Sequence, residues 1–140
     1  MVITRTLKDG TKMIYSSNAN LLSEKTEYRN YQYDVEISET DFNILCDNLD
    51  SGDIDHYDIN KVFAIVEHTG DSIEEAINRR EAYEFYDVDT LEDLAEQLVD
   101  DGIWGNVNDT LKGYINFERL GNDLEYDGYE ETNFGIIRAL

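Results

Sequence analysis

The sequence predicts an α+β fold with N-terminal strands and one or two helices, an acidic helical middle and a C-terminal β-hairpin. A strong turn signal, Asp9-Gly10, lies between two β-rich runs. Apolar residues recur at helical spacing between Asp87 and Gly102, and two strand-like runs close the chain. The 140 residues suffice for one domain or two very small ones. We expect a small α+β domain over residues 1–70 and an acidic helical domain with the hairpin over 71–140.

Residues 1–70 combine strand patterns with one well-capped helix. The expected elements are a type I′ hairpin over 1–17, a loop or short helical turn over 18–30, a strand over 31–37, a helix over 39–49 and a strand over 61–67. Ser38 and Asp41 have capping-box spacing at the start of the helix, and Gly52 ends it. Phe42, Leu45, Cys46 and Leu49 are its expected inward side chains.

Residues 71–140 are predicted to be mainly helical. The expected elements are a helix from Ile73 to about Tyr86 capped by Asp71 or Ser72, a helix within 87–102 capped by Asp89 or Thr90, and a turn with apolar anchors at Ile103-Trp104-Gly105. A short helix capped by Asn108 or Asp109, a helix over 117–124 capped by Asn116, and hairpin strands over 125–129 and 134–139 follow. The pattern contains no repeat and no Gly/Ser linker.

The helix over 87–102 is the most regular element. Its apolar stripe is Leu91, Leu94, Ala95, Leu98 and Val99. Its opposite face carries Glu92, Asp93, Glu96, Asp100 and Asp101 without a Lys or Arg. Acids at a helix C-terminus are mildly unfavourable because the helix dipole is negative there. The face is therefore either a solubility feature or a surface that requires negative charge.

The net charge of −21 is the strongest constraint on function. It excludes direct binding to nucleic acid or anionic membranes, which requires basic surfaces. It favours a basic partner, such as a protein that itself grips phosphates. Residues 81–131 hold sixteen acids and two bases, whereas residues 1–35 hold four acids and five bases. The acidity is thus concentrated around the helix over 87–102.

The sequence offers no catalytic or metal motif. His56 and His68 lack metal-ligand spacing, and Cys46 lies on the apolar face of its helix. The acidic runs fit no EF-hand register, and P-loop, dinucleotide and nucleophile-elbow patterns are absent. We therefore expect no enzyme activity, no cofactor and no metal. The start of the chain lacks a signal-peptide pattern and no run is long enough to span a membrane, so a cytoplasmic protein is expected.

A phosphate-like array is the positive hypothesis for the acids. Duplex DNA carries about one charge per 1.7 Å of axis. Five acids between Glu92 and Asp101 span roughly 14 Å of helix, or about one charge per 3 Å. One helix is too sparse, so neighbouring acidic segments would have to continue the array. The runs over 47–58, 81–89 and 123–131 are available for this.

The segment from Leu94 to Tyr129 resembles the C-terminal half of ArdA antirestriction proteins. The shared features, in order, are an acidic helix closing on Asp101-Gly102, then Gly105, a short helix with Leu111, the step Tyr114-Ile115-Asn116-Phe117, the pair Asp123-Leu124 and a hairpin after Gly128-Tyr129. The resemblance covers about the last 60 residues, and the N-terminal part is divergent. This chain has Asn108 where the family often has proline, and it is shorter than usual.

The resemblance implies a DNA mimic from a phage or mobile element. Such proteins are acidic homodimers that occupy the DNA-binding groove of type I restriction–modification enzymes and have no catalytic residues. The candidate phosphate-like positions in the segment and its preceding turn are Glu92, Asp93, Glu96, Asp100, Asp101, Asp109, Glu118, Asp123, Glu125 and Asp127.

Three alternatives remain open at the sequence level. An anti-CRISPR inhibitor of a Cas nuclease would also fit a basic nucleic-acid channel. An immunity protein that blocks a basic toxin nuclease has a similar size and acidity. A calcium-dependent module or carboxylate enzyme is the third class.

Overall fold

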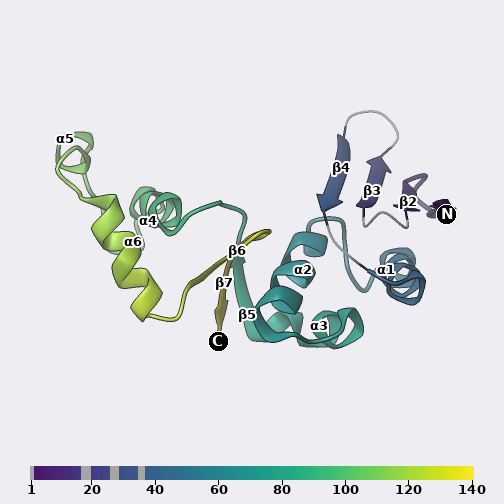
Figure 1. Cartoon of the computed structure of the whole chain (residues 1–140). Coiled ribbons are helices and arrows are strands. Elements are labelled where there is room, and N and C mark those ends of the chain that lie inside the picture. The colour runs from purple at the N-terminus through teal and green to yellow at the C-terminus, as the bar shows by residue number, and fades with distance from the viewer. Residues whose placement is uncertain (1, 17–19, 26–28, 35–36) are drawn as a thin grey trace. The chain divides into compact units, whose positions relative to one another are not determined.

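The computed structural model describes residues 2–16, 20–25, 29–34 and 37–140 (Figure 1). For residues 20–25 and 29–34 it is the backbone that is described. The chain divides into two compact units, Met1–His56 and Tyr57–Leu140. Each unit has its own buried apolar residues, and strands and helices occur in both. The predicted α+β class is confirmed.

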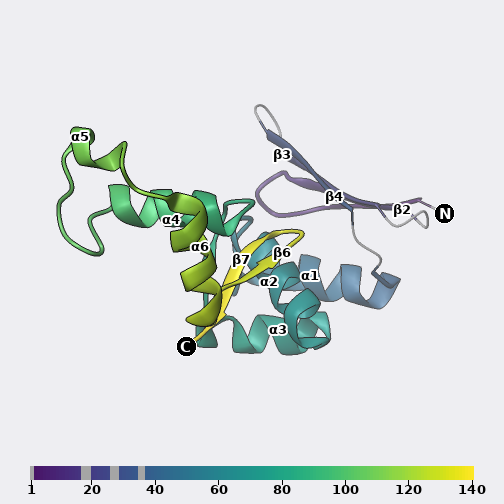
Figure 2. The same cartoon turned by 60° about the vertical axis from the view of Figure 1, so that its left-hand side comes forward.

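Four antiparallel strands form the sheet of the first unit, in the order β1-β2-β3-β4 (Figure 2). The strands are β1 Val2–Thr6, β2 Lys12–Ser16, β3 Asn20–Lys25 and β4 Arg29–Asp34. The predicted loop over 18–30 is wrong where it covers β3, which pairs with β2 and β4 on its two sides. Pairing on both sides satisfies the backbone of a polar segment that has little strand propensity of its own.

The strand predicted over 31–37 is β4, which ends at Asp34; residues 35 and 36 lie outside the described residues. Residues 1 and 17 of the predicted hairpin, and residues 18, 19 and 26–28 of the predicted loop, also lie outside them.

The β1–β2 connection is a hairpin, but its turn is not the predicted type I′. The Gly10 N–H donates to the Leu7 carbonyl at 3.0 Å, and the Leu7 N–H donates to the Thr11 carbonyl at 2.8 Å. Gly10 has a φ of 89°. This is the pattern of a three-residue loop closed by a left-handed glycine. Asp9 stabilises it by accepting the Thr11 N–H at 2.9 Å.

Helix α1, Glu39–Ser51, follows the sheet and confirms the helix predicted over 39–49. The Ser38 side chain accepts the Asp41 N–H, and Gly52 ends the helix in a left-handed conformation. Phe42, Leu45 and Cys46 are buried, and Tyr15 of β2 stacks on Phe42 with ring centroids 5.7 Å apart. Three predicted inward residues are therefore core residues, and Leu49 is half-buried.

The second unit begins with α2, Asp58–Thr69, where a strand over 61–67 was predicted. That prediction is wrong. Ile59, Val62 and Phe63 are buried at helical spacing, as are Ala64 and Ile65. A short apolar run does not distinguish a strand from a fully packed helix by periodicity. The decisive residues precede the run, since Ile59 extends the i, i+3, i+4 pattern.

Helix α3, Ile73–Arg79, is capped by Ser72 as predicted, but it does not continue to Tyr86. A short 3₁₀ turn, η1 Arg80–Ala82, leads into β5, Tyr83–Tyr86. The aromatic sequence of β5 suits a strand, and β5 pairs antiparallel with β7. The local helical pattern could not predict β5, because this strand is defined by its pairing with β7 at the distant end of the chain.

The C-terminal hairpin consists of β6, Glu130–Thr132, and β7, Gly135–Ala139, in a sheet of order β5-β7-β6. The hairpin is confirmed, although its first strand starts after the predicted residues 125–129, because α6 continues to Tyr126. Its turn is fastened to α2: Glu67 accepts the Asn133 N–H at 2.7 Å and the Asn133 side-chain amide at 2.6 Å.

The acidic helical segment comprises α4 Leu91–Asp100, α5 Asp109–Lys112 and α6 Phe117–Tyr126. Helices α4 and α6 pack against each other, as Figures 1 and 2 show. Thr90, Asn108 and Asn116 cap the three helices through their side chains, which confirms the predicted starts. Gly102, with φ of 72°, closes α4 with the paired bonds Gly102 N–H to Val99 and Ile103 N–H to Leu98.

Candidate partner-binding surface

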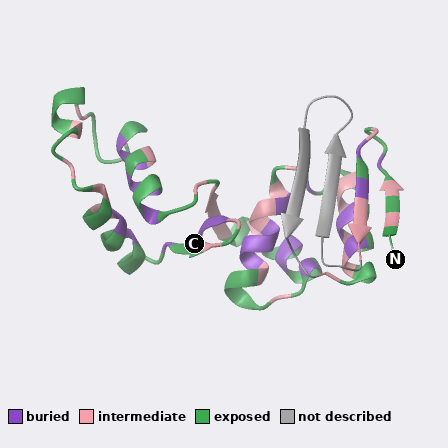
Figure 3. Cartoon of the chain, turned by 45° about the horizontal axis from the view of Figure 1, so that its top comes forward, coloured by how far each residue is buried: buried purple, intermediate pink, exposed green. Residues whose placement is uncertain are grey.

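Helix α4 separates its apolar and acidic residues as the sequence predicts. Leu94 and Ala95 are fully buried, and Leu91, Leu98 and Val99 are at most 9% exposed. The acids of the opposite face, Glu92, Asp93, Glu96 and Asp100, are all exposed, as is Asp101 at the helix end. Figure 3 shows this division along α4 and α6. Burial of the stripe fixes the helix, so the carboxylates project into solvent from a rigid element.

Helix α6 presents the second group of predicted acids. Leu124 and Gly121 are buried against the α4 side, and Phe117 and Leu120 pack on the same core. Glu118, Asp123 and Glu125 are exposed on α6, and Asp127 is exposed just after it. All ten predicted positions are therefore exposed; Asp109 lies on α5. Together we call them the α4–α6 acidic surface.

Most of this surface lacks a cationic partner within the described part of the chain. Lys112 contacts two of the ten acids, with Nζ 2.8 Å from Asp100 Oδ1 and 3.9 Å from Asp109 Oδ1. The hydrogen bond with Asp100 raises the pKa of Lys112. No other ion pair among the described residues involves the α4–α6 acidic surface. The lysine ties α5 to the end of α4 and leaves the remaining carboxylates uncompensated.

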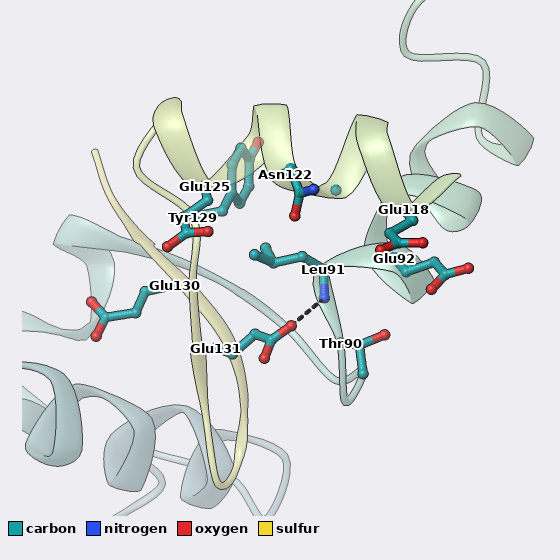
Figure 4. Close-up of a pocket in the computed structure, with 10 residues that line it drawn as sticks. Thr90, Leu91, Glu92, Glu118, Asn122, Glu125, Tyr129, Glu130 and Glu131 are labelled. Carbon is teal, nitrogen blue, oxygen red and sulfur yellow. Dashed lines mark hydrogen bonds between the residues drawn. The ribbon is translucent and has the colours of Figure 1, made fainter. Parts of the chain in front are cut away.

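An open pocket of about 480 Å³ brings carboxylates from three elements together (Figure 4). Glu92 of α4 and Glu118 and Glu125 of α6 line it, so the structure unites three of the ten predicted residues. The other wall is formed by Glu130 and Glu131 of β6. No Lys or Arg is among the ten lining residues.

The full lining consists of Thr90, Leu91, Glu92, Glu118, Gly121, Asn122, Glu125, Tyr129, Glu130 and Glu131. The structure does not bring the other seven predicted acids into this pocket: Asp93, Glu96, Asp100, Asp101, Asp109, Asp123 and Asp127.

Glu130 and Glu131 were not among the sequence-predicted site residues. Glu131 accepts the Leu91 N–H at 2.8 Å, so a hairpin carboxylate caps the N-terminus of α4. Glu130 forms an ion pair with His68 Nδ1 on α2. Both acids lie between the two predicted hairpin strands, and Glu131 is forty residues from Leu91. They belong to the acidic run 123–131 that the sequence offers as a continuation of the array, but no local pattern indicates that Glu131 reaches the start of α4.

Tyr129 fixes the junction between α6 and the hairpin. It is 8% exposed, and its ring lies beneath the Arg138 guanidinium at 4.6 Å. Its ring centroid is 6.1 Å from that of Tyr86. Burial raises the pKa of Tyr86. These contacts make the pocket wall a continuation of the packed core rather than a free loop.

The segment between α4 and α6 exposes large apolar side chains. Ile103, Trp104, Leu111 and Tyr114 are 53–84% exposed. The prediction that Ile103 and Trp104 act as apolar anchors within the fold is therefore wrong. Gly102 directs the chain away from the core after α4, so these side chains do not reach it. Four exposed large apolar residues occur within twelve positions of the chain, and exposed apolar surface can mark a protein contact. We call these four residues the 103–114 apolar patch.

The histidines and the cysteine have structural contacts. His56 Nε2 lies 3.2 Å from Asp9 Oδ2 and 3.4 Å from Thr11 Oγ1. Cys46 is buried, and burial raises the pKa of its thiol to about 11. Within the described residues, no group of three or more His, Cys, Asp or Glu side chains is arranged to hold a metal ion. Nor does any described helix have the length and apolar character needed to cross a membrane.

Comparison with known families gives one match over most of the chain. The family model described as antirestriction protein (ArdA) matches residues 11–138. The match extends far beyond the last 60 residues that carry the resemblance in the sequence, and it includes strands β2, β3 and β4 and helix α1 of the first unit. A search of curated proteins found no match.

Proposed function

The chain belongs to the ArdA family of antirestriction proteins, and on that premise we propose that it inhibits type I restriction–modification enzymes as a DNA mimic. In this proposal its carboxylates occupy the phosphate positions of a DNA-binding groove. It acts by binding alone, without catalysis or a cofactor, in the cytoplasm of a bacterial host.

The uncompensated α4–α6 acidic surface is the observation that supports this proposal. A protein that binds DNA neutralises phosphates with Lys and Arg and gains affinity from that electrostatic contact. Acids that are exposed, rigidly mounted and largely without internal partners offer such a groove the same interaction. The pocket adds Glu130 and Glu131 to the array. Two packed helices and a hairpin edge thus raise the charge density above that of one helix.

We also propose that the protein acts as a homodimer joined through the 103–114 apolar patch. An acidic helix of ten residues is only about 15 Å long, so a second copy would extend the array along a duplex-sized groove. The patch supplies apolar surface that one copy leaves exposed. Asp101 precedes the patch and has no cationic partner among the described residues, so it would repel its counterpart in the second copy. Added salt should therefore strengthen the dimer.

The dimer proposal is tested by measuring mass in solution across protein and salt concentrations. Trp104→Ser should give a monomer, whereas Tyr126→Ser, which changes a 92% exposed tyrosine outside the patch, should not. A wild-type protein that stays monomeric at high concentration and high salt contradicts the dimer.

The inhibitory function is tested with a purified type I restriction–modification enzyme and a DNA substrate. We expect the chain to block cleavage, and we expect the inhibition to weaken by roughly tenfold or more between low and physiological salt, because charge-steered binding is screened. A Cas nuclease assayed in parallel tests the anti-CRISPR alternative. Absence of inhibition of the restriction enzyme, or inhibition that does not change with salt, would overturn the proposed mechanism.

A further inference from the structure

Gly121 lies at the closest approach between the two acidic helices. It is buried in the middle of α6, where glycine costs about 1 kcal/mol relative to alanine. A Cβ built at this position would lie 2.9 Å from the Leu91 carbonyl carbon and 3.0 Å from both the Leu91 oxygen and the Glu92 nitrogen. All three atoms belong to the α4 backbone and cannot rotate away. The absence of a side chain at Gly121 therefore allows α4 and α6 to pack more closely than they could with any other residue at this position.

The residues around this contact are the carboxylates of the pocket. Glu118, Gly121 and Glu125 recur at i, i+3 and i+7 on α6, so both acids flank the glycine on one stripe. Glu92 follows Leu91 directly on α4. All four line the same pocket, as Figure 4 shows for the three acids. The backbone contact at Gly121 thus sets the separation between Glu92 and the two α6 carboxylates.

We propose that Gly121 is a positioning residue of the acidic array, and that the partner protein reads the separation of these three carboxylates rather than their total charge. This inference rests on the proposed function. The expected physical basis is preorganisation: a groove built for phosphates has fixed cationic positions, and carboxylates held at matching positions need no rearrangement on binding. A surface that acted through net charge alone would tolerate a wider helix pair.

The first test compares Gly121→Ala with Gly113→Ala. Neither changes charge. A Cβ at Gly113 would meet its nearest atom at an ordinary 3.5 Å, so that variant controls for the glycine-to-alanine change. In Gly121→Ala, α4 and α6 must separate by at least a few tenths of an ångström, which a crystal structure of the variant measures. We expect about tenfold weaker inhibition by Gly121→Ala and unchanged inhibition by Gly113→Ala. Because Gly113 lies between Leu111 and Tyr114 of the proposed dimer contact, the mass of each variant in solution is measured alongside and should equal that of the wild type.

Binding to polylysine measures the effect of net charge alone, because a flexible polycation does not require carboxylates at fixed positions. Both glycine variants should bind polylysine as the wild type does, because all their carboxylates remain. A Gly121→Ala protein whose helices are separated but which inhibits normally would overturn the proposal. So would an unchanged helix separation.

A second variant keeps the test valid if Gly121→Ala does not fold. The double substitution Glu125→Gln with Tyr126→Glu preserves the net charge and moves one carboxylate by about 100° around α6. Tyr126 is 92% exposed, so the fold is not at risk, and Tyr126→Gln is the control for its loss. We expect the double variant to inhibit as weakly as Glu125→Gln alone. Inhibition at the wild-type level would show that the partner does not depend on the position of this carboxylate.

The outcomes separate this inference from the proposed function. If the wild type does not inhibit the restriction enzyme, the proposed function fails. If the wild type inhibits and Gly121→Ala and the double variant inhibit equally well, the proposed DNA mimicry is retained. The positioning role of Gly121 is then contradicted.

Discussion

Acids of the α4–α6 surface and a group of paired acids elsewhere in the chain have different surroundings. Arg5 Nη2 lies 2.5 Å from Asp47 Oδ1 and 3.4 Å from Asp50 Oδ2, and the hydrogen bond with Asp47 raises the pKa of Arg5. Arg79 likewise contacts Asp71, and Arg138 contacts Glu84. On the α4–α6 acidic surface one lysine contacts two of ten acids. The first group fastens secondary-structure elements together, whereas the second leaves its charge available to a partner.

Reversing the charge of the α4 face should give the largest effect. The triple variant Glu92→Lys, Glu96→Lys and Asp100→Lys should weaken inhibition about a thousandfold, because three like-charge contacts with a basic groove each oppose binding. Inhibition of DNA cleavage is the measurement.

A matched control for the triple variant changes Glu39, Glu74 and Glu75 to Lys. These residues are exposed and lie outside the α4–α6 acidic surface, and the change in net charge is the same. Equal loss of inhibition in both variants would show that net charge, not this surface, is responsible.

Truncating the buried face of the same helix should affect stability. Leu94 is fully buried in the α4–α6 core, so Leu94→Ala should lower the free energy of unfolding by about 3 kcal/mol. Urea denaturation followed by circular dichroism measures it. The fraction of Leu94→Ala that remains folded should still inhibit. Loss of inhibition by fully folded Leu94→Ala would show that the buried face also affects binding to the partner.

The Glu131 carboxylate should have a smaller effect on stability. Replacing it with Gln removes the charge that accepts the Leu91 N–H at the start of α4, where an acid is favoured by the helix dipole. We expect a loss of about 1 kcal/mol of unfolding free energy. Glu96→Gln, which removes an exposed charge from the middle of α4 and leaves its N-terminus unchanged, is the control. An unchanged free energy of unfolding in Glu131→Gln would show that this contact does not stabilise α4.

The smallest expected effect concerns Asp9 in the first unit. Burial raises its pKa, but hydrogen bonds from Thr11 and His56 outweigh burial, so the pKa lies below the ordinary value of 3.8. A depressed carboxyl pKa contributes stability above the unfolded pKa, and that stability is lost as pH falls through the folded pKa. Asp9→Asn should therefore reduce the steepness of acid unfolding below about pH 4. Stability is measured by urea denaturation at a series of pH values. The same loss of stability below pH 4 in Asp9→Asn and in the wild type would contradict this role.

The sequence predicts the elements whose signals are local. Thr90, Asn108 and Asn116 cap their helices, and the stripe of α4 is buried, because capping and amphipathic spacing act within a few residues. The errors occur where distant pairing decides. Strand β3 and strand β5 are defined by their neighbours in a sheet. The error at α2 is different, because Ile59 supplies a local helical signal just before the apolar run.

The candidate site shows the same division. Exposure of the predicted acids within α4 and α6 follows from helix periodicity. The contributions of Glu130 and Glu131, and the close approach at Gly121, depend on how α4, α6 and the hairpin meet. A glycine inside a helical pattern can signal close packing. It does not reveal which backbone it meets.

Competition with DNA tests the central claim most directly. Fluorescently labelled DNA bound to a type I restriction–modification enzyme is titrated with the wild-type protein, with the triple α4 variant and with its charge-matched control. DNA mimicry through the α4–α6 acidic surface predicts mutually exclusive binding: the wild type and the control displace the DNA, excess DNA displaces the protein, and the triple variant displaces little. A ternary complex in which the enzyme holds DNA and the wild-type protein at the same time would contradict the claim.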